Sequence, residues 1–294
     1  MIVVRITGGM GNQMFQYASA YALAKDLGAE LTVDLEDYQL RQIHNGYELE
    51  RVFGIKAEQV DRRKLGFLLR TTPYALRRRL KKWTKRIPSN YYLEDKFDYQ
   101  PIPKSEGAVY YLEGYFQSER YFLHRRSEVS QLFRLQLPMS SPTAECIGRI
   151  QSANSVAIHV RRGDYTNANV QKVHGLLPPT YFQGAAQQMA RMTENPEFFV
   201  FSDDPNWCEK NLSFNGRPVT FVHACLGPLA WEHMHMMSHC RHHIIANSSF
   251  SWWAAWLCKF PQKRIIAPKP WFKDPKKTAN DIYQAGTIAL ESGF

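Results

Sequence analysis

The chain has 294 residues, of which 44% are hydrophobic and 13% aromatic, and this composition is typical of a globular protein. No apolar run reaches the roughly 18 residues that a membrane-spanning helix needs, so we expect no such helix. The five cysteines are scattered without CxxC spacing, which argues against a disulfide framework and favours reduced thiols in a cytoplasm.

The formal net charge of +10 comes from one segment of the chain. Residues 62–86 carry eleven basic residues and no acidic one, whereas the rest of the chain carries 26 basic and 27 acidic residues. The charge is therefore no general nucleic-acid signature, and we expect no nucleic-acid partner. Leu76, Leu80 and Trp83 recur at helical spacing here, as in a helix that lies on an anionic membrane surface. A solvated basic helix without a partner fits this pattern equally well.

The first half of the chain opens as a βαβ unit. A strand is predicted at residues 2–7 and the next strand at residues 31–35. Between them lie the glycine turn GGMGN and a helix over residues 13–27, which Gly28 ends. This order implies a parallel sheet.

The second half alternates strands and helices in the same way. Strands are predicted at residues 155–160, 198–204, 218–223, 242–248 and 264–271, with helices near residues 179–192, 230–240 and 249–258. A last helix, over residues 278–290, could pack back on the first half. The fold class is therefore α/β, with two Rossmann-like domains that face a cleft. We expect these domains at residues 1–140 and 141–278, followed by the C-terminal helix within residues 279–294.

The N-terminal glycine turn resembles a dinucleotide-binding turn only in part. Gly9, Gly11 and Met14 fall where GxGxxG has three glycines, and Asp34 lies near the position of a ribose-binding acid. The missing third glycine argues against a nicotinamide or flavin site. We favour a turn that brings backbone amides and Asn12 or Gln13 to a ligand, and a tight turn without a ligand is the alternative.

The segment HVRRGDY, residues 159–165, places two arginines at the end of a predicted buried strand. Open α/β sheets bind their ligands at the carboxyl ends of their strands. Arginine offers a planar fork for phosphate oxygens, so Arg161 and Arg162 could neutralise a departing diphosphate without a metal ion. Asp164 could orient an arginine, bind a hydroxyl or act as a base. A structural Arg–Asp ion pair at a strand end is the alternative.

Two further strands of the second half also end in polar residues. One ends at Asn247, after which Ser248 or Ser249 caps a helix whose free amides form an anion site. The tryptophans of that helix are expected in the core. The other strand ends in Ser202, Asp203 and Asp204, whose carboxylates could accept hydrogen bonds from a base or a sugar. A helix-capping pair is the alternative there.

The histidines near residue 235 are compatible with a zinc site, but the surroundings argue against it. His235 and His239 lie four residues apart on a predicted helix, with Glu232 one turn earlier. No HExxH motif is present, and the methionines among these histidines favour a packed helix. We therefore predict no metal site.

Five of these segments together resemble the family 11 glycosyltransferases, the α-1,2-fucosyltransferases of bacterial type. The matching segments are ITGGMGNQMFQYA (6–18), YLEGYFQ (111–117), HVRRGDY (159–165), FSDD (201–204) and MSHCRHHIIANSSFSWWAAWL (237–257). They stand in the family's order over nearly the whole chain. The resemblance implies a GT-B-like fold, with the donor nucleotide in the C-terminal domain. It implies an inverting transfer from GDP-β-L-fucose that needs no cofactor and no metal.

The resemblance also implies roles for single residues. Arg161 and, less directly, Arg162 would contact the β-phosphate of the donor, and His159 with Asp203 or Asp204 would read guanine. Asn12 would face the pyrophosphate. The remaining donor-binding residues implied by the motifs are Gly9, Gly11, Ser202, Asn247, Ser248, Ser249 and Phe250.

The acceptor implied by the resemblance is a galactose-containing glycan whose 2-hydroxyl attacks the sugar. Asp164 is our first choice for the base that takes the proton, and His174 is the second. We expect a cytoplasmic bacterial enzyme, with possible peripheral membrane contact through residues 62–86.

Two other function classes remain open. A dinucleotide-dependent oxidoreductase would use GGMGNQ, and a binder of nucleic acid or anionic surfaces would use residues 62–86. Neither explains why three polar motifs of the second half each fall at the end of a strand.

Overall fold

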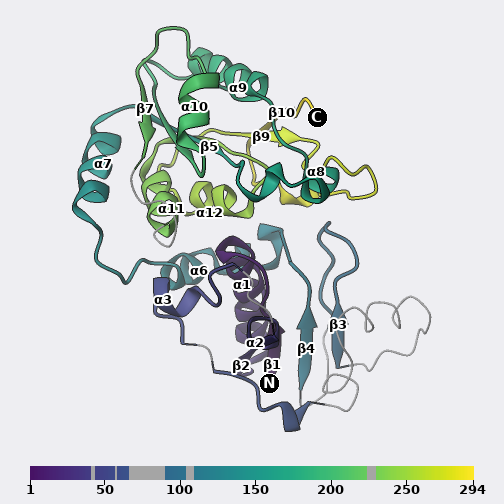
Figure 1. Cartoon of the computed structure of the whole chain (residues 1–294). Coiled ribbons are helices and arrows are strands. Elements are labelled where there is room, and N and C mark those ends of the chain that lie inside the picture. The colour runs from purple at the N-terminus through teal and green to yellow at the C-terminus, as the bar shows by residue number, and fades with distance from the viewer. Residues whose placement is uncertain (41–43, 57, 66–89, 104–108, 224–229) are drawn as a thin grey trace. The chain divides into compact units, whose positions relative to one another are not determined.

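The computed structural model describes residues 1–40, 44–56, 58–65, 90–103, 109–223 and 230–294 (Figure 1). Nearly all of the basic segment 62–86 lies outside these residues. The chain forms two compact units, Met1–Gln136 and Leu137–Phe294. None of the helices in the described part of the chain is long and apolar enough to cross a membrane.

The first unit contains a parallel four-stranded sheet of order β2-β1-β4-β3. Its strands are β1 (Ile2–Arg5), β2 (Leu31–Asp34), β3 (Tyr91–Leu93) and β4 (Tyr110–Glu113). Its α-helices are α1 (Met10–Leu27), α2 (Glu36–Leu40), α3 (Leu49–Phe53) and α6 (Arg126–Leu132), and its 3₁₀ turns are η1 (Arg62–Lys64), η2 (Glu119–Tyr121) and η3 (Leu123–Arg125). The predicted βαβ opening and parallel sheet are confirmed.

Helix α1 begins at Met10, earlier than the predicted start at residue 13. Gly9 is the N-cap, with an extended backbone, and Gly8 makes the turn with φ of +82°. Gly11 and Asn12 therefore lie in the first helical turn. The helix ends at Gly28, whose left-handed φ of +59° lets its N–H bond back to the last turn, as predicted.

The second unit contains a parallel six-stranded sheet of order β10-β9-β8-β5-β6-β7. Its strands are β5 (Ser155–Val160), β6 (Glu197–Ser202), β7 (Val219–Val222), β8 (His242–Ile244), β9 (Ile265–Lys269) and β10 (Thr287–Glu291). Its α-helices are α7 (Ser141–Ser152), α8 (Ala168–His174), α9 (Pro179–Met192), α10 (Pro205–Asn211), α11 (Ala230–His239) and α12 (Ser249–Leu257), with the 3₁₀ turns η4 (Asp164–Thr166) and η6 (Asn280–Ile282). Helices α9 and α10 lie on one side of this sheet and α11 and α12 on the other (Figure 1).

The predicted C-terminal helix over residues 278–290 is wrong. The 3₁₀ turn η6 and Gly286, with φ of +78°, lead into strand β10, which pairs in parallel with β9. Ile288 and Leu290 alternate along this strand and pack against the apolar core of the second unit. A period of two over residues 287–291 therefore outweighs the helix propensity of the alanine and leucine, and the segment belongs to the second unit.

The tryptophans of α12 lie in the core of the second unit. Trp252, Trp253 and Trp256 are at most 1% exposed and contact one another ring to ring, 5.1 to 6.4 Å between centroids. The indole of Trp252 donates to the carbonyl of Ile282. This packing holds α12, so its N-terminus has a fixed place at the edge of the sheet.

Candidate functional site

The polar motifs of the second unit meet at the carboxyl edge of its sheet. Strand β5 lies between β6 and β8, with Val160 opposite Ser202 and Ile158 opposite Ile244. The residues that follow these three strands are therefore neighbours, as the sequence predicts. This edge is where parallel α/β sheets bind ligands.

The guanidinium of Arg161 lies between two carboxylates. Its Nη2 is 2.7 Å from Oδ1 of Asp164, and its Nη1 is 2.9 Å from Oδ2 of Asp203. The Arg161 side chain keeps 32% of its surface exposed. A charged fork is thus held in place at the strand end while part of it faces solvent.

Arg162 is fixed more firmly than Arg161. Its guanidinium stacks over the ring of Trp207 at 3.7 Å, and its Nε donates to Oδ2 of Asp204 at 3.3 Å. The backbone N–H of Arg162 donates to Oδ1 of Asp203 at 2.8 Å. These contacts indicate that Arg162 stabilises the loop that follows β5. Its contact with a phosphate stays a prediction.

The two aspartates after β6 have different partners. Asp204 caps α10 by accepting from the N–H of Trp207 at 3.2 Å, and its own N–H donates to Oγ of Ser202 at 2.9 Å. The helix-capping alternative therefore holds for Asp204. Asp203 instead joins Arg161 to the backbone of Arg162. The contact of Asp203 or Asp204 with guanine stays a prediction.

Gly163 is required by the close approach of Asp203. A Cβ at position 163 would lie 2.7 Å from Oδ2 of Asp203, so any larger residue would displace the carboxylate that holds Arg161. This packing explains why a glycine follows the two arginines.

His159 carries a buried nitrogen that lacks a partner among the described residues. The side chain is 5% exposed, its Nδ1 makes no hydrogen bond, and its ring lies 5.6 Å from the ring of Phe250. Burial lowers the pKa of His159 to about 3, so the imidazole is neutral at pH 7. Buried polar groups in folded proteins are rarely unpaired, so this nitrogen is available to a water molecule or a ligand at this edge.

The N-terminus of α12 lies after β8 at the same edge of the sheet. Ser248 is the N-cap, and its Oγ accepts from the N–H of Phe250 at 3.3 Å. A serine hydroxyl that accepts one bond still has its own hydrogen to donate. The helix end therefore offers backbone amides, a hydroxyl and the positive end of the helix dipole to an anion. Ser249 is the first helical residue.

Asn247 has a structural role that sequence reasoning missed. Its Nδ2 donates to the carbonyls of His174 at 2.6 Å and of Trp271 at 3.2 Å, and the residue is 2% exposed. Its own carbonyl accepts from the hydroxyl of Tyr165 at 2.9 Å. Asn247 thus ties three loops together, and both hydrogens of its side-chain amide are used within the chain. A contact of Asn247 with the donor would therefore have to use an atom other than Nδ2.

His174 and Asp164 were the two candidates for a base. The ring of His174 lies 5.2 Å from Tyr165 and 5.4 Å from Phe272, and its buried Nδ1 has no hydrogen-bond partner in the described part of the chain. Burial, with Lys277 nearby, lowers its pKa, so it is neutral at pH 7. Asp164 is 45% exposed and ion-paired with Arg161.

The N-terminal turn has a different arrangement from the one predicted. The glycine with positive φ is Gly8, and a Cβ there would lie 2.7 Å from Nδ2 of Asn12. Gln13 is fully buried and binds the chain itself, because its Nε2 donates to the carbonyl of Gly46 at 2.8 Å and its Oε1 accepts from the N–H of Glu48. Gln13 is therefore a structural residue and not a ligand contact, whereas Asn12 remains a candidate.

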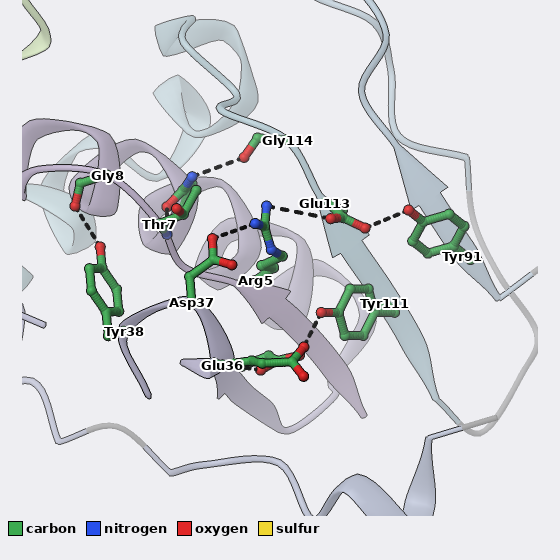
Figure 2. A network of polar contacts seen from close by, with 12 residues as sticks. Arg5, Thr7, Gly8, Glu36, Asp37, Tyr38, Tyr91, Tyr111, Glu113 and Gly114 are labelled. Atoms are coloured by element: carbon green, nitrogen blue, oxygen red, sulfur yellow. Dashed lines mark hydrogen bonds and ion pairs between the residues drawn. The ribbon is translucent and has the colours of Figure 1, made fainter. Parts of the chain in front are cut away.

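A polar network at the carboxyl edge of the first sheet was not predicted (Figure 2). Arg5, the last residue of β1, pairs with Asp37 and lies 3.4 Å from the fully buried Glu113. Glu113 in turn accepts from the hydroxyl of Tyr91 at 2.5 Å. The βαβ pattern indicated that the strands of Arg5 and Asp34 share a sheet, but the sequence did not show that the strand ending at Glu113 lies next to them.

Asp34 is used within this network. Its Oδ2 accepts from the hydroxyl of Tyr111 at 2.6 Å, and its Oδ1 accepts from the N–H of Glu36 at 3.0 Å. The residue is 4% exposed. A ribose-binding acid needs a free carboxylate, so this arrangement argues against the dinucleotide-binding alternative.

The histidines of α11 have structural partners. Glu232 accepts hydrogen bonds from Ser140 and Thr143, and Nδ1 of His239 lies 2.9 Å from the carbonyl of His235. In the part of the chain that the structure describes, no group of three or more His, Cys, Asp or Glu is placed to hold a metal ion.

Comparison with known proteins shows the family. The model of "Glycosyl transferase family 11" matches residues 1–291. An Escherichia coli "Alpha-1,2-colitosyltransferase" is 32% identical over 99% of both chains, and the E. coli "O-antigen biosynthesis glycosyltransferase WbnK" is 30% identical over 93% of this chain and 95% of its own. The bovine "Galactoside 2-alpha-L-fucosyltransferase SEC1" is 27% identical over 87% of this chain and 64% of its own.

The solved structures show the same fold. A crystal structure of NodZ α-1,6-fucosyltransferase from a co-crystal with GDP aligns with a TM-score of 0.50 at 17% identity, over 86% of this chain and 91% of its own. The structure of a mutant of Arabidopsis thaliana FUT1 in complex with GDP also aligns at 0.50, with 14% identity over 92% of this chain and 71% of its own. The chain thus belongs to glycosyltransferase family 11 and has the GT-B fold of fucosyltransferases.

Proposed function

We propose that the protein transfers L-fucose, with inversion, from GDP-β-L-fucose to the 2-hydroxyl of a galactose residue in a glycan. The family supports the reaction class, and the names of the relatives support an α-1,2 linkage. The relative with 32% identity is named for colitose, so colitose is the second candidate for the transferred sugar. The observation that carries the proposal is the guanidinium of Arg161, held between Asp164 and Asp203 at the edge where parallel α/β sheets bind ligands.

In this proposal the guanidinium of Arg161 releases the carboxylates of Asp164 and Asp203 and binds the diphosphate of the donor. The bidentate fork that contacts Asp164 and Asp203 suits paired phosphate oxygens equally well. Charge develops on GDP as the bond to the sugar breaks, and Arg161 with the amides of α12 stabilises it. Ser248 and Ser249 add hydroxyl donors, and the neutral His159 offers its unpaired Nδ1 to guanine. Asn12, in the first unit, is kept as a candidate donor of amide N–H groups to a substrate.

The ion pair of Asp164 suggests how a base becomes available. In the structure the Asp164 carboxylate is engaged by Arg161, so it is not free to contact an acceptor hydroxyl. A diphosphate that takes over Arg161 would release Asp164 to accept the proton of the acceptor hydroxyl. His174 is the alternative base, since its lowered pKa leaves it neutral and able to accept a proton at pH 7.

We also propose that the transfer needs no metal ion. Positive charge for the departing diphosphate comes from Arg161 and from the N-terminus of α12, which are ordinary substitutes for a divalent cation at a phosphate. Activity is therefore expected to persist in EDTA.

The test is a transfer assay with purified protein, GDP-fucose and galactose-terminated acceptors, with EDTA present, followed by product mass. We expect a fucosylated product from the protein and from Arg191→Ala, and at least about a hundredfold slower formation with Arg161→Ala. Arg191 is the matched control because it is an exposed arginine near the end of α9, close to the start of β6 and not to the carboxyl end of that strand. A colitosylated product formed only from GDP-colitose would change the sugar but keep the reaction. If neither donor binds or reacts, the proposal is wrong.

A further inference from the structure

The loop after β4, residues 114–117, is anchored by a carboxylate from the neighbouring strand end. Glu94, which directly follows β3, accepts from the N–H of Tyr115 at 2.7 Å through Oε2. The N–H of Phe116 lies 3.0 and 3.1 Å from the two oxygens of the same carboxylate. Both donors are backbone groups, so the position of Glu94 fixes the path of the chain through this loop.

The loop needs such an anchor because its backbone is unusual. Phe116 has φ of +52° although it is not a glycine, and its side chain is fully buried. A left-handed conformation strains a non-glycine residue and persists only where neighbours enforce it. Gly114 has no room for a side chain, because a Cβ there would lie 2.5 Å from Cβ of Glu94. The close packing of Glu94 on the loop therefore compensates its strain.

The loop ends on the first turn of α1. Gln117 Nε2 donates to Oδ1 of Asn12 at 2.8 Å. A second bond, from Gln16 Nε2 to the carbonyl of Gly114 at 3.0 Å, joins α1 to the start of the loop. The contact from Gln117 occupies the oxygen of the Asn12 amide. The two hydrogens on Nδ2 are then left for another acceptor, and within the described residues no group takes them.

From this chain of contacts we infer that Glu94 and Gln117 are positioning residues, which together orient the Asn12 amide so that its two N–H groups are left for a substrate group. The inference rests on the proposed function, in which Asn12 is a candidate donor to a substrate. It also explains three residues of the segment YLEGYFQ. Gly114 leaves room for Glu94, and Phe116 turns the backbone of the loop. Gln117 donates the hydrogen bond to Asn12.

The protonation state of Glu94 offers a way to observe this role. Burial raises the pKa of Glu94 to about 7, with Asp95 adding to the effect and the amide donors and Tyr121 opposing it. Tyr92, from β3, also interacts with Glu94. As the carboxylate, Glu94 makes charge-assisted bonds to the loop, and as the acid it makes weaker ones.

The first experiment is a kinetic cycle on Gln117 and Asn12. Gln117→Glu keeps the size of the side chain and loses the donor, so kcat should fall about tenfold with KM nearly unchanged. In the Asn12→Ala background the same change should have no further effect, because Gln117 acts through Asn12. An unchanged kcat for Gln117→Glu, or an equal loss in both backgrounds, would overturn the inference.

The second experiment is a pH profile. The kcat of the unaltered enzyme should fall as pH drops below about 7, and Glu94→Gln should lack this step because glutamine keeps a carbonyl acceptor at every pH. Glu58→Gln is the matched control, since Glu58 is an exposed glutamate in the same unit, and it should keep the step. The inference fails if Glu94→Gln and Glu58→Gln give the same profile.

A third readout does not depend on turnover and so separates this inference from the proposed function. The side-chain amide resonance of Asn12, assigned with Asn12→Ala, should shift in Gln117→Ala and in Glu94→Ala but not in Glu58→Gln. A resonance that stays in place in both variants would overturn the positioning role even if the enzyme transfers fucose. A shift without any turnover would support it while the proposed function failed.

Discussion

At the scale of single residues, the site depends on the close contacts that hold the Arg161 guanidinium in place. Asp203 reaches Arg161 only because residue 163 has no side chain, and the backbone of Arg162 fixes the other oxygen of the same carboxylate. Burial leaves His159 neutral and unpaired beside Phe250. The sequence indicated these residue types at a strand end. It could not say which carboxylate each arginine contacts, because that depends on rotamers and on the neighbouring strand.

We predict that Gly163→Ala weakens binding of GDP about tenfold without unfolding the protein. The new Cβ would meet Oδ2 of Asp203 at 2.7 Å and move the carboxylate that holds Arg161. Isothermal titration with GDP measures the change, and a thermal melt confirms folding.

Gly148→Ala is the control for that substitution. Gly148 lies in α7, where an added Cβ would have nothing within 4 Å, and alanine suits a helix better than glycine. Its GDP affinity should be unaltered. Equal affinities for both variants and the parent would contradict the account of Gly163.

At the scale of elements, helix α12 and strand β5 carry the site. Strand β5 lies between β6 and β8, and α12 is fixed by its buried tryptophans, so their ends keep a constant spacing. The alternation of strands and helices predicted this arrangement well, because βαβ units force parallel order. Residues 278–290 were mistaken for a helix because Ala285, Ala289 and Leu290 are good helix formers, whereas pairing with β9 decides the structure.

We predict that Ser248→Ala lowers the free energy of unfolding by about 1 kcal/mol, since it removes the N-cap of α12. Ser249→Ala, one residue further on, has no capping bond to lose and should leave stability within a few tenths of a kcal/mol. Urea unfolding followed by circular dichroism distinguishes the two. Equal stability of both variants would show that the cap is not formed.

At the scale of the whole molecule, the balance of buried titratable groups sets the response to pH. Burial lowers the pKa of His159 and His243 to about 3, and of His235 and His242 to about 4. A histidine that is harder to protonate when folded stabilises the protein above its unfolded pKa of about 6.5, and this contribution disappears as pH falls towards the folded value. Glu94 acts in the opposite direction, because its raised pKa favours the folded protein as pH falls from about 7 to 4.5.

We predict that the histidines dominate, so that stability decreases between about pH 6.5 and pH 4. His159 and His243 are almost fully buried, and each could contribute up to about 1.4 kcal/mol per pH unit in this window. His243→Gln should reduce the slope of stability against pH, and Glu94→Gln should increase it. Chemical unfolding at pH 7, 6 and 5 gives the slopes, and a slope that is independent of both substitutions would contradict the assignment.

In the proposed function, the carboxyl edge of the second sheet binds the diphosphate of a guanine nucleotide through Arg161. Isothermal titration of GDP into the protein, with EDTA present, tests it most directly. We expect saturable binding by the protein and by Arg191→Ala, and binding at least about tenfold weaker by Arg161→Ala. Binding that is absent from the unaltered protein, or equally strong in Arg161→Ala, would contradict the account.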